Sequence, residues 1–108
     1  MTVLYAVINS GFQISGDVDL TKGVLHAIAV PTITSGDLLV RGSFDTTSAN
    51  FWRIQKSEAN SGALTYATGP GSVMVQTRDS MPWMPYVRLE LSVAQADTRT
   101  MAMLVRQW

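Results

Sequence analysis

Short apolar stretches, separated by turn-forming residues about every eight to twelve positions, are the feature that most restricts what this chain can fold into. Breaks of this kind occur at Asn9-Ser10-Gly11, at Lys22-Gly23 and at Thr34-Ser35-Gly36-Asp37. A globular helix usually needs a longer uninterrupted stretch, whereas a β-strand is complete within a few residues. The spacing therefore predicts an all-β protein of about seven or eight short strands.

Alternation of apolar and polar residues supports this prediction in two places. Residues 86–93 point apolar side chains to one side at every second position, and residues 38–44 follow the same period. A period of two is the signature of a pleated strand with one buried face. Residues 24–30 are apolar on both faces, which predicts a buried strand. Pro31 is expected to end that strand, because proline has no N–H to donate to its neighbour.

The remaining predicted strands are shorter or less regular, and they cover residues 2–8, 51–55, 64–67, 72–77 and 99–107. One alternative concerns the end of the chain. Residues 94–108 contain good helix formers, with Met101, Leu104 and Val105 at helical spacing. We favour a strand there, because a lone terminal helix fits poorly beside so many β-branched and aromatic strands.

The chain is long enough for one domain and too short for two. It has 108 residues, of which 46% are hydrophobic and 15% are charged, a composition typical of a globular protein. We therefore predict a single antiparallel β-sandwich over residues 1–108, with jelly-roll or Greek-key strand order. Residues 1–23 are expected to act as an N-terminal arm or as an added strand, since the apolar start must pair within its own sheet or along a neighbour's edge.

Charge and cysteine counts exclude several classes of function. Eight Lys and Arg balance eight Asp and Glu, so the net charge is zero. Nucleic-acid binding draws on a basic excess, and so does binding to an anionic membrane surface. We therefore expect neither partner. The chain has no cysteine, which excludes disulfides, zinc–thiolate sites and thiol nucleophiles. Zero net charge also favours association between copies.

Catalytic and metal-binding patterns are weak in this sequence. His26 is the one histidine, and it lies inside an apolar stretch, so we interpret it as a structural residue and not as a general base. Asp17 and Asp19 beside Gly16 superficially suggest calcium, but the six or more oxygen ligands of a full site do not follow. We expect no enzyme activity, no catalytic residue, no cofactor and no metal.

Aromatic and apolar residues near the two ends of the chain are the best candidates for contact with a partner. Trp52 is interpreted as a core residue, because it neighbours Ile54 in a predicted strand. A tryptophan at a chain terminus is difficult to bury intramolecularly and easy to anchor in a neighbour. The candidate partner-binding residues are Val3, Leu4, Tyr5, Trp83, Tyr86 and Trp108.

Four segments together carry a resemblance to a known family. They read LHAIAVP at 25–31, LLVRGSFD at 38–45, PYVRLELS at 85–92 and QADTRTMAMLVR at 95–106. This pattern resembles small β-sandwich virion proteins of tailed bacteriophages, which decorate or cement the head shell or occur near the tail. It is also similar to discoidin-like and carbohydrate-binding jelly rolls.

The resemblance implies a non-enzymatic structural protein of the virion. Its most direct form is a capsid decoration or cement protein that binds the major capsid protein and neighbouring copies of itself. The expected location is the virion, after synthesis in the host cytoplasm. The alternative is a carbohydrate-binding module displayed on a virion or tail, with Trp52, Trp83 or Tyr86 as the stacking surface and Asp and Asn side chains around it.

Overall fold

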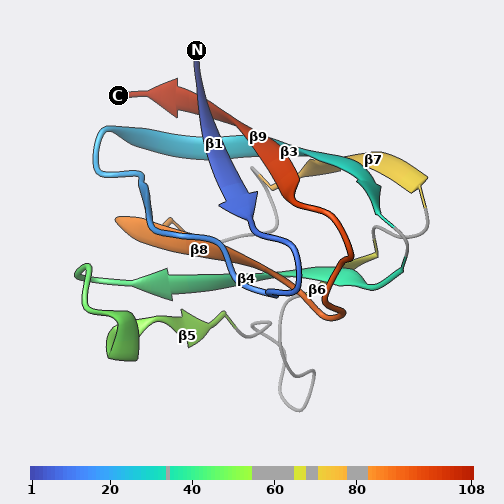
Figure 1. Ribbon diagram of the computed structural model, residues 1–108. Coiled ribbons are helices and arrows are strands. Elements are labelled where there is room, and N and C mark those ends of the chain that lie inside the picture. The colour runs from blue at the N-terminus through green and yellow to red at the C-terminus, as the bar shows by residue number, and fades with distance from the viewer. Residues whose placement is uncertain (34, 55–64, 68–70, 78–82) are drawn as a thin grey trace.

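Two antiparallel sheets lie face to face in the computed structural model, which describes residues 1–33, 35–54, 65–67, 71–77 and 83–108 (Figure 1). Within these residues the strands are β1 (Thr2–Ile8), β2 (Val18–Asp19), β3 (Gly23–Ile33), β4 (Asp37–Ser43), β5 (Trp52–Arg53), β6 (Thr65–Ala67), β7 (Gly71–Gln76), β8 (Tyr86–Leu91) and β9 (Arg99–Gln107). One short 3-10 helix, η1, covers Ser48–Asn50. The predicted all-β sandwich is confirmed.

The strand order is that of a jelly roll. Sheet A has the order β1-β9-β3-β7, and sheet B has the order β2-β8-β4-β5, with β6 also paired to β4. The first and last strands are therefore neighbours, and most connections carry the chain from one sheet to the other (Figure 1). β5 and β6 pair with different parts of β4, so together they occupy one strand position beside it. The nine described strands therefore fill the eight strand positions of a jelly roll.

The predicted strands agree well with the structure at the end of the chain. β9 has the predicted bounds, and it pairs with both β1 and β3 in the centre of sheet A. The helical alternative for residues 94–108 is therefore wrong. Pairing with strands on both sides gives the backbone N–H and C=O groups of β9 the hydrogen bonds that a helix would form internally. Residues 55 and 64, at the ends of two predicted strands, lie outside the described residues.

Pro31 does not end its strand, contrary to the prediction. β3 continues to Ile33, and the register of its pairing with β7 shifts between Val30 and Ile33. Pro31 lies within this register shift, where the regular hydrogen bonding between β3 and β7 is interrupted, so its missing N–H breaks no further strand-to-strand bond. The extra length lets β3 span the whole sheet.

The core lies between the two sheets and is built from the inward side of each strand. Its fully buried members include Ile28, Val40, Leu89, Met101 and Met103. On β1, the inward residues are Leu4, Ala6 and Ile8, of which the last two are buried. Residues 1–23 thus contribute β1 to sheet A and β2 to sheet B of the same molecule.

Candidate functional site

The outer surface of sheet A carries a continuous set of uncharged, mostly apolar side chains, which we call the apolar face. Its members point away from the core on all four strands: Val3, Tyr5, Val7, Ala27, Ala29, Met74, Ala102 and Leu104. One row crosses the whole sheet, because Tyr5 pairs with Ala102, Ala102 with Ala29, and Ala29 with Met74. The two alanines form a low floor between the large side chains at either edge.

The large members of the apolar face are strongly exposed. Tyr5 is 65% exposed and Met74 is 63% exposed, with Val3, Val7 and Leu104 also on the surface. Together they expose on the order of 500 Å², which is the size of the largest apolar patch on a typical monomer, and such patches are often functional. Desolvation of this face is inexpensive because no charged group has to lose its water.

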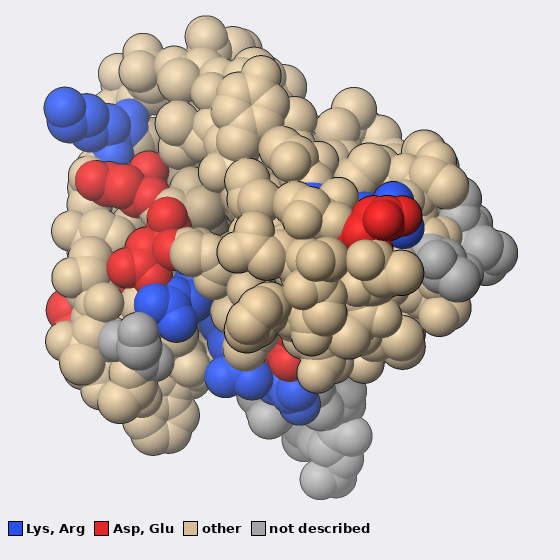
Figure 2. Space-filling view, in the orientation of Figure 1, with Lys and Arg blue, Asp and Glu red and all other residues tan. Residues whose placement is uncertain are grey.

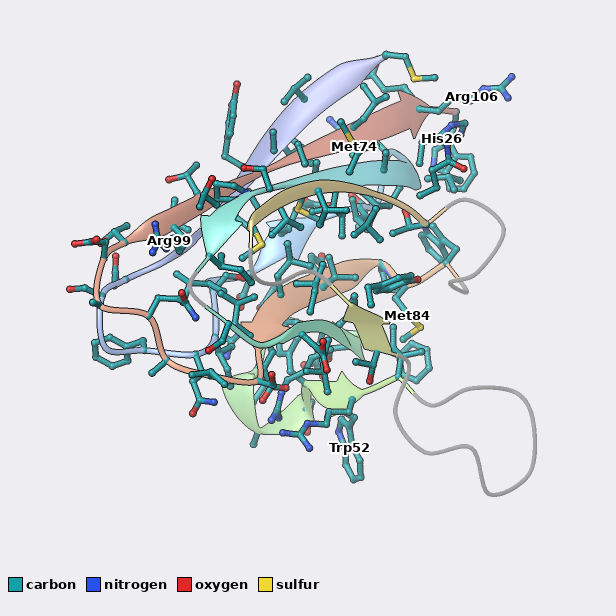
Figure 3. The ribbon with its side chains drawn as sticks, turned by 90° about the vertical axis from the view of Figure 1, so that its right-hand side faces the viewer. His26, Trp52, Met74, Met84, Arg99 and Arg106 are labelled. Atoms are coloured by element: carbon teal, nitrogen blue, oxygen red, sulfur yellow. The ribbon has the colours of Figure 1, made fainter. Side chains whose placement is uncertain are left out.

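Charges are distributed very unevenly between the two sheets. In β1, β3, β7 and β9 only Arg99 and Arg106 are charged, and Figure 3 shows them at opposite ends of the sheet. The shorter strands of sheet B contain six charged residues: Asp19, Asp37, Arg41, Arg53, Arg88 and Glu90. Figure 2 shows a broad uncharged area at its top and centre, with charged side chains gathered at the left, below, and in a small group at the right.

An ionic network covers the outer side of sheet B. Glu90 is only 4% exposed, and it accepts hydrogen bonds from Arg53 at 2.9 Å and 3.1 Å and from Arg41 at 3.0 Å. Burial raises the pKa of the Glu90 carboxyl, but the bonds and charges of Arg53 and Arg41 outweigh burial, so its pKa lies below the ordinary value. Arg88 bonds Asp17 and lies over the Phe51 ring at 4.3 Å. The charged side chains on this side of sheet B are therefore paired within the chain.

The two tryptophans among the predicted contact residues lie together beyond the end of sheet A. The rings of Trp83 and Trp108 are 5.8 Å apart and inclined by 60°. The indole N–H of Trp83 donates to the carbonyl of Gly23 at 2.8 Å, and that of Trp108 donates to the carbonyl of Thr21 at 3.0 Å. Trp108 is thus anchored within its own chain while 74% of it stays exposed.

The structure divides the predicted partner-binding residues among three places. Val3 and Tyr5 lie on the apolar face, whereas Leu4 points inward and packs against the core. Trp83 and Trp108 form the separate pair just described. Tyr86 is half-buried on β8, where it pairs with Asp19 and Ser43. The six residues therefore do not form one surface.

Sequence reasoning missed most of the apolar face. Val7, Ala27, Ala29, Met74, Ala102 and Leu104 were not among the predicted contact residues. A signal was present, because the segments that become β1, β3 and β7 contain no Asp, Glu, Lys or Arg at all. Counting charges strand by strand would have distinguished three strands without any charge from the charged strands of sheet B.

A pocket beside β5 of sheet B is a second candidate site. A pocket of about 380 Å³ is lined by Gly42, Ser43, Phe44, Asp45, Asn50, Trp52 and Met84. Trp52 is 69% exposed, so its interpretation as a core residue is wrong, and Figure 3 shows it pointing away from both sheets. The reason is that β5 is a two-residue strand at the edge of sheet B, where the rest of the described chain leaves Trp52 uncovered.

The carboxylate of this pocket is held ready for a polar ligand. Asp45 accepts the backbone N–H of Thr47 at 2.9 Å and the side-chain amide of Asn50 at 3.0 Å. The Thr47 bond, followed by the Asn50 bond, holds the pKa of Asp45 below its ordinary value, so the group is ionised near neutral pH. Oδ1 also accepts the Asn50 amide at 3.3 Å, so it is Oδ2 that keeps a second lone pair for a hydroxyl donor.

Among the described residues, His26 does not lie with the partners that a serine hydrolase needs, and no metal-binding cluster is found. The pocket beside His26 is lined by Val24, His26, Arg106, Gln107 and Trp108, a set with neither a carboxylate nor a serine. Within the described residues, no group of three His, Asp or Glu side chains is placed to hold a metal ion. The described residues also include no helix that is long and apolar enough to cross a membrane.

Comparisons with protein-family models, with curated proteins and with solved structures find no match to this chain. The candidate site is therefore inferred from the geometry of the described residues alone.

Proposed function

We propose that this chain is a non-enzymatic structural protein that binds to a larger assembly through the apolar face of sheet A. The observation that carries the proposal is the contrast between the two sheets. Sheet B covers its outer side with paired charges, whereas sheet A leaves an uncharged surface open across four strands. A surface of this kind gains free energy when a partner removes it from water.

The specific form that we propose is a capsid decoration or cement protein of a tailed bacteriophage. The sequence resemblance supports this form, and jelly rolls are common in viral capsid domains. Its partners would be the major capsid protein and neighbouring copies, and its location the virion. Many weak contacts repeated over a shell hold firmly, because each bound copy raises the effective concentration of the next contact.

The test is the position and number of copies of the chain in purified virions of a phage that encodes it. We expect cryo-electron microscopy to place sheet A against the head shell, and quantitative mass spectrometry to find copies in a fixed ratio to the shell subunit. Met74→Lys should reduce incorporation by about tenfold, because it puts a charge on the apolar face at its β7 edge. Ala96→Lys, which adds the same charge on an exposed loop, is the matched control. Virions that lack the chain would refute the proposal.

A carbohydrate-binding function is the second candidate, and the pocket beside Trp52 favours it. Exposed aromatic rings at Phe44 and Trp52 offer apolar faces to a sugar ring, while Asp45 and Asn50 supply acceptors and donors for its hydroxyls. Trp83 and Trp108 suit this role less well, because their rings are inclined by 60° and do not form one plane.

The sugar-binding candidate makes its own prediction. A glycan array should find a ligand for the intact chain, and Trp52→Ala should weaken its binding by roughly tenfold through loss of the stacking surface. Tyr5→Ala, which removes an exposed aromatic ring from the outer side of the other sheet, should leave the affinity unchanged. Equal loss in the two variants, or an array with no bound glycan, excludes the pocket as a saccharide site.

A further inference from the structure

β1 presents an open edge that the rest of the described chain does not cover. It is the end strand of sheet A, and β9 is the one described strand that pairs with it (Figure 1). The β1–β9 pairing runs through seven consecutive residue pairs without a register shift, so the strand is regular along its whole length. Every second residue therefore directs an N–H and a C=O away from the sheet.

This edge lacks the features that normally prevent edge-to-edge pairing. Natural edge strands are guarded by lysines, prolines, bulges or very short length. Thr2–Ile8 has seven residues, with no charge and no proline. β7, at the other edge, is shorter, and the register of its pairing with β3 shifts between Val30 and Ile33. The unguarded edge of sheet A is therefore β1.

The sequence of β1 is complementary to itself when it runs antiparallel to a second copy. With Tyr5 at the centre, Val3 lies opposite Val7 of the second copy, and Tyr5 lies opposite Tyr5. On the inward side Leu4 lies opposite Ala6, and Thr2 opposite Ile8. Branched and aromatic residues opposite each other stabilise antiparallel pairs, and no like charges meet. The register uses all seven residues and leaves none unpaired.

We propose that β1 pairs with β1 of a second copy around a two-fold axis at Tyr5. The two four-stranded sheets then form one sheet of eight strands, with a single apolar face twice as wide. The inference rests on the proposed function, since it names one partner of that same surface. The contact closes on itself, which distinguishes it from a β1-to-β7 contact that would propagate into a filament.

The interface is small, so the dimer should be weak in dilute solution. Interfaces of less than about 1,200 Å² in total are typical of transient complexes. Within a shell, repeated contacts with the surface beneath would reinforce it. Sedimentation equilibrium between about 10 μM and 1 mM should therefore show the 11.8 kDa mass rising to twice that value and stopping there. A species that stays monomeric over this range, or that grows beyond two copies, overturns the inference.

Two double variants test the register. Val3→Lys combined with Val7→Glu places a lysine opposite a glutamate at both ends of the pairing, so dimerisation should be kept. Val3→Lys combined with Val7→Lys places lysine opposite lysine and should raise the dimer dissociation constant at least about tenfold. Thr46→Lys with Ala96→Lys adds the same two charges away from the edge and should behave as the wild type. Equal weakening in the two Val3 variants rejects the register.

The outcomes separate this inference from the proposed function. Val3 and Val7 are exposed in the single copy, so thermal unfolding of all variants should differ little. Met74→Lys should keep the β1 dimer and lose incorporation into virions, because Met74 lies at the opposite edge of sheet A. If the Val3 variants behave alike while Met74→Lys prevents incorporation, edge pairing is wrong and the docking of the apolar face stands.

Discussion

Replacement of Glu90 by alanine is expected to lower the free energy of unfolding by about 2–3 kcal/mol. The carboxylate is buried, and it joins β8 to β4 and β5 through Arg41 and Arg53. Removing one partner of a fully buried ion pair costs about 3–5 kcal/mol. The cost here should be lower, because the side chains of Arg41 and Arg53 are 26% and 51% exposed and regain water.

The pH dependence of stability provides a sharper version of this test. The pKa of Glu90 is lowered in the folded protein from its ordinary value of 4.5. Its contribution to stability is therefore complete above pH 4.5 and is lost as the pH falls through the folded pKa. Glu90→Gln cannot titrate, so the wild type should lose more stability than this variant between neutral and acid pH. Asp19 and Asp45 also have lowered pKa values, but they are common to both proteins.

Chemical denaturation at several pH values measures both effects. Asp97→Ala, which removes an exposed carboxylate on a loop, is the control and should change stability by less than about 0.5 kcal/mol. Parallel pH profiles for the wild type and Glu90→Gln would show that the network does not stabilise the folded state through the charge of Glu90.

The strands with clear alternation could be predicted from the sequence, and those shaped by their neighbours could not. In β8 and β9 apolar residues recur at every second position, so the local sequence predicts which face of each strand is buried. The course of β3 past Pro31 depends on where its pairing with β7 shifts, which is a property of two strands. Trp52 has an apolar neighbour, Ile54, but it is exposed because β5 is a two-residue strand at the edge of sheet B.

The candidate site shows the same division. Val3 and Tyr5 could be found because an apolar strand must pair within its own sheet or along a neighbour's edge. Met74 and Leu104 could not, since only the sheet order β1-β9-β3-β7 places them on the same outer face as Val3 and Tyr5. The same holds for Glu90, whose contact with Arg53 requires both strands to lie next to β4. Contacts between distant segments depend on register, which a single sequence does not reveal.

Leu89→Ala is expected to have the largest effect on folding, with a loss of about 2–5 kcal/mol from the free energy of unfolding. Leu89 is fully buried between the sheets and lies opposite Val40 on the neighbouring strand. Its removal leaves a cavity that a rigid two-sheet core cannot close. Denaturant unfolding of the two proteins measures the difference.

Leu104→Ala removes the same atoms from the outer side of sheet A instead of from the core, and it serves as the matched control. Leu104 is on the apolar face, 36% exposed, so its loss should cost the single copy about 1–2 kcal/mol, less than the loss of Leu89. It should nevertheless reduce incorporation into virions, an assay in which the chain must use that face. A Leu104→Ala protein that is destabilised as much as Leu89→Ala, with unchanged incorporation, would mean that the outer side of sheet A serves the fold and not a partner.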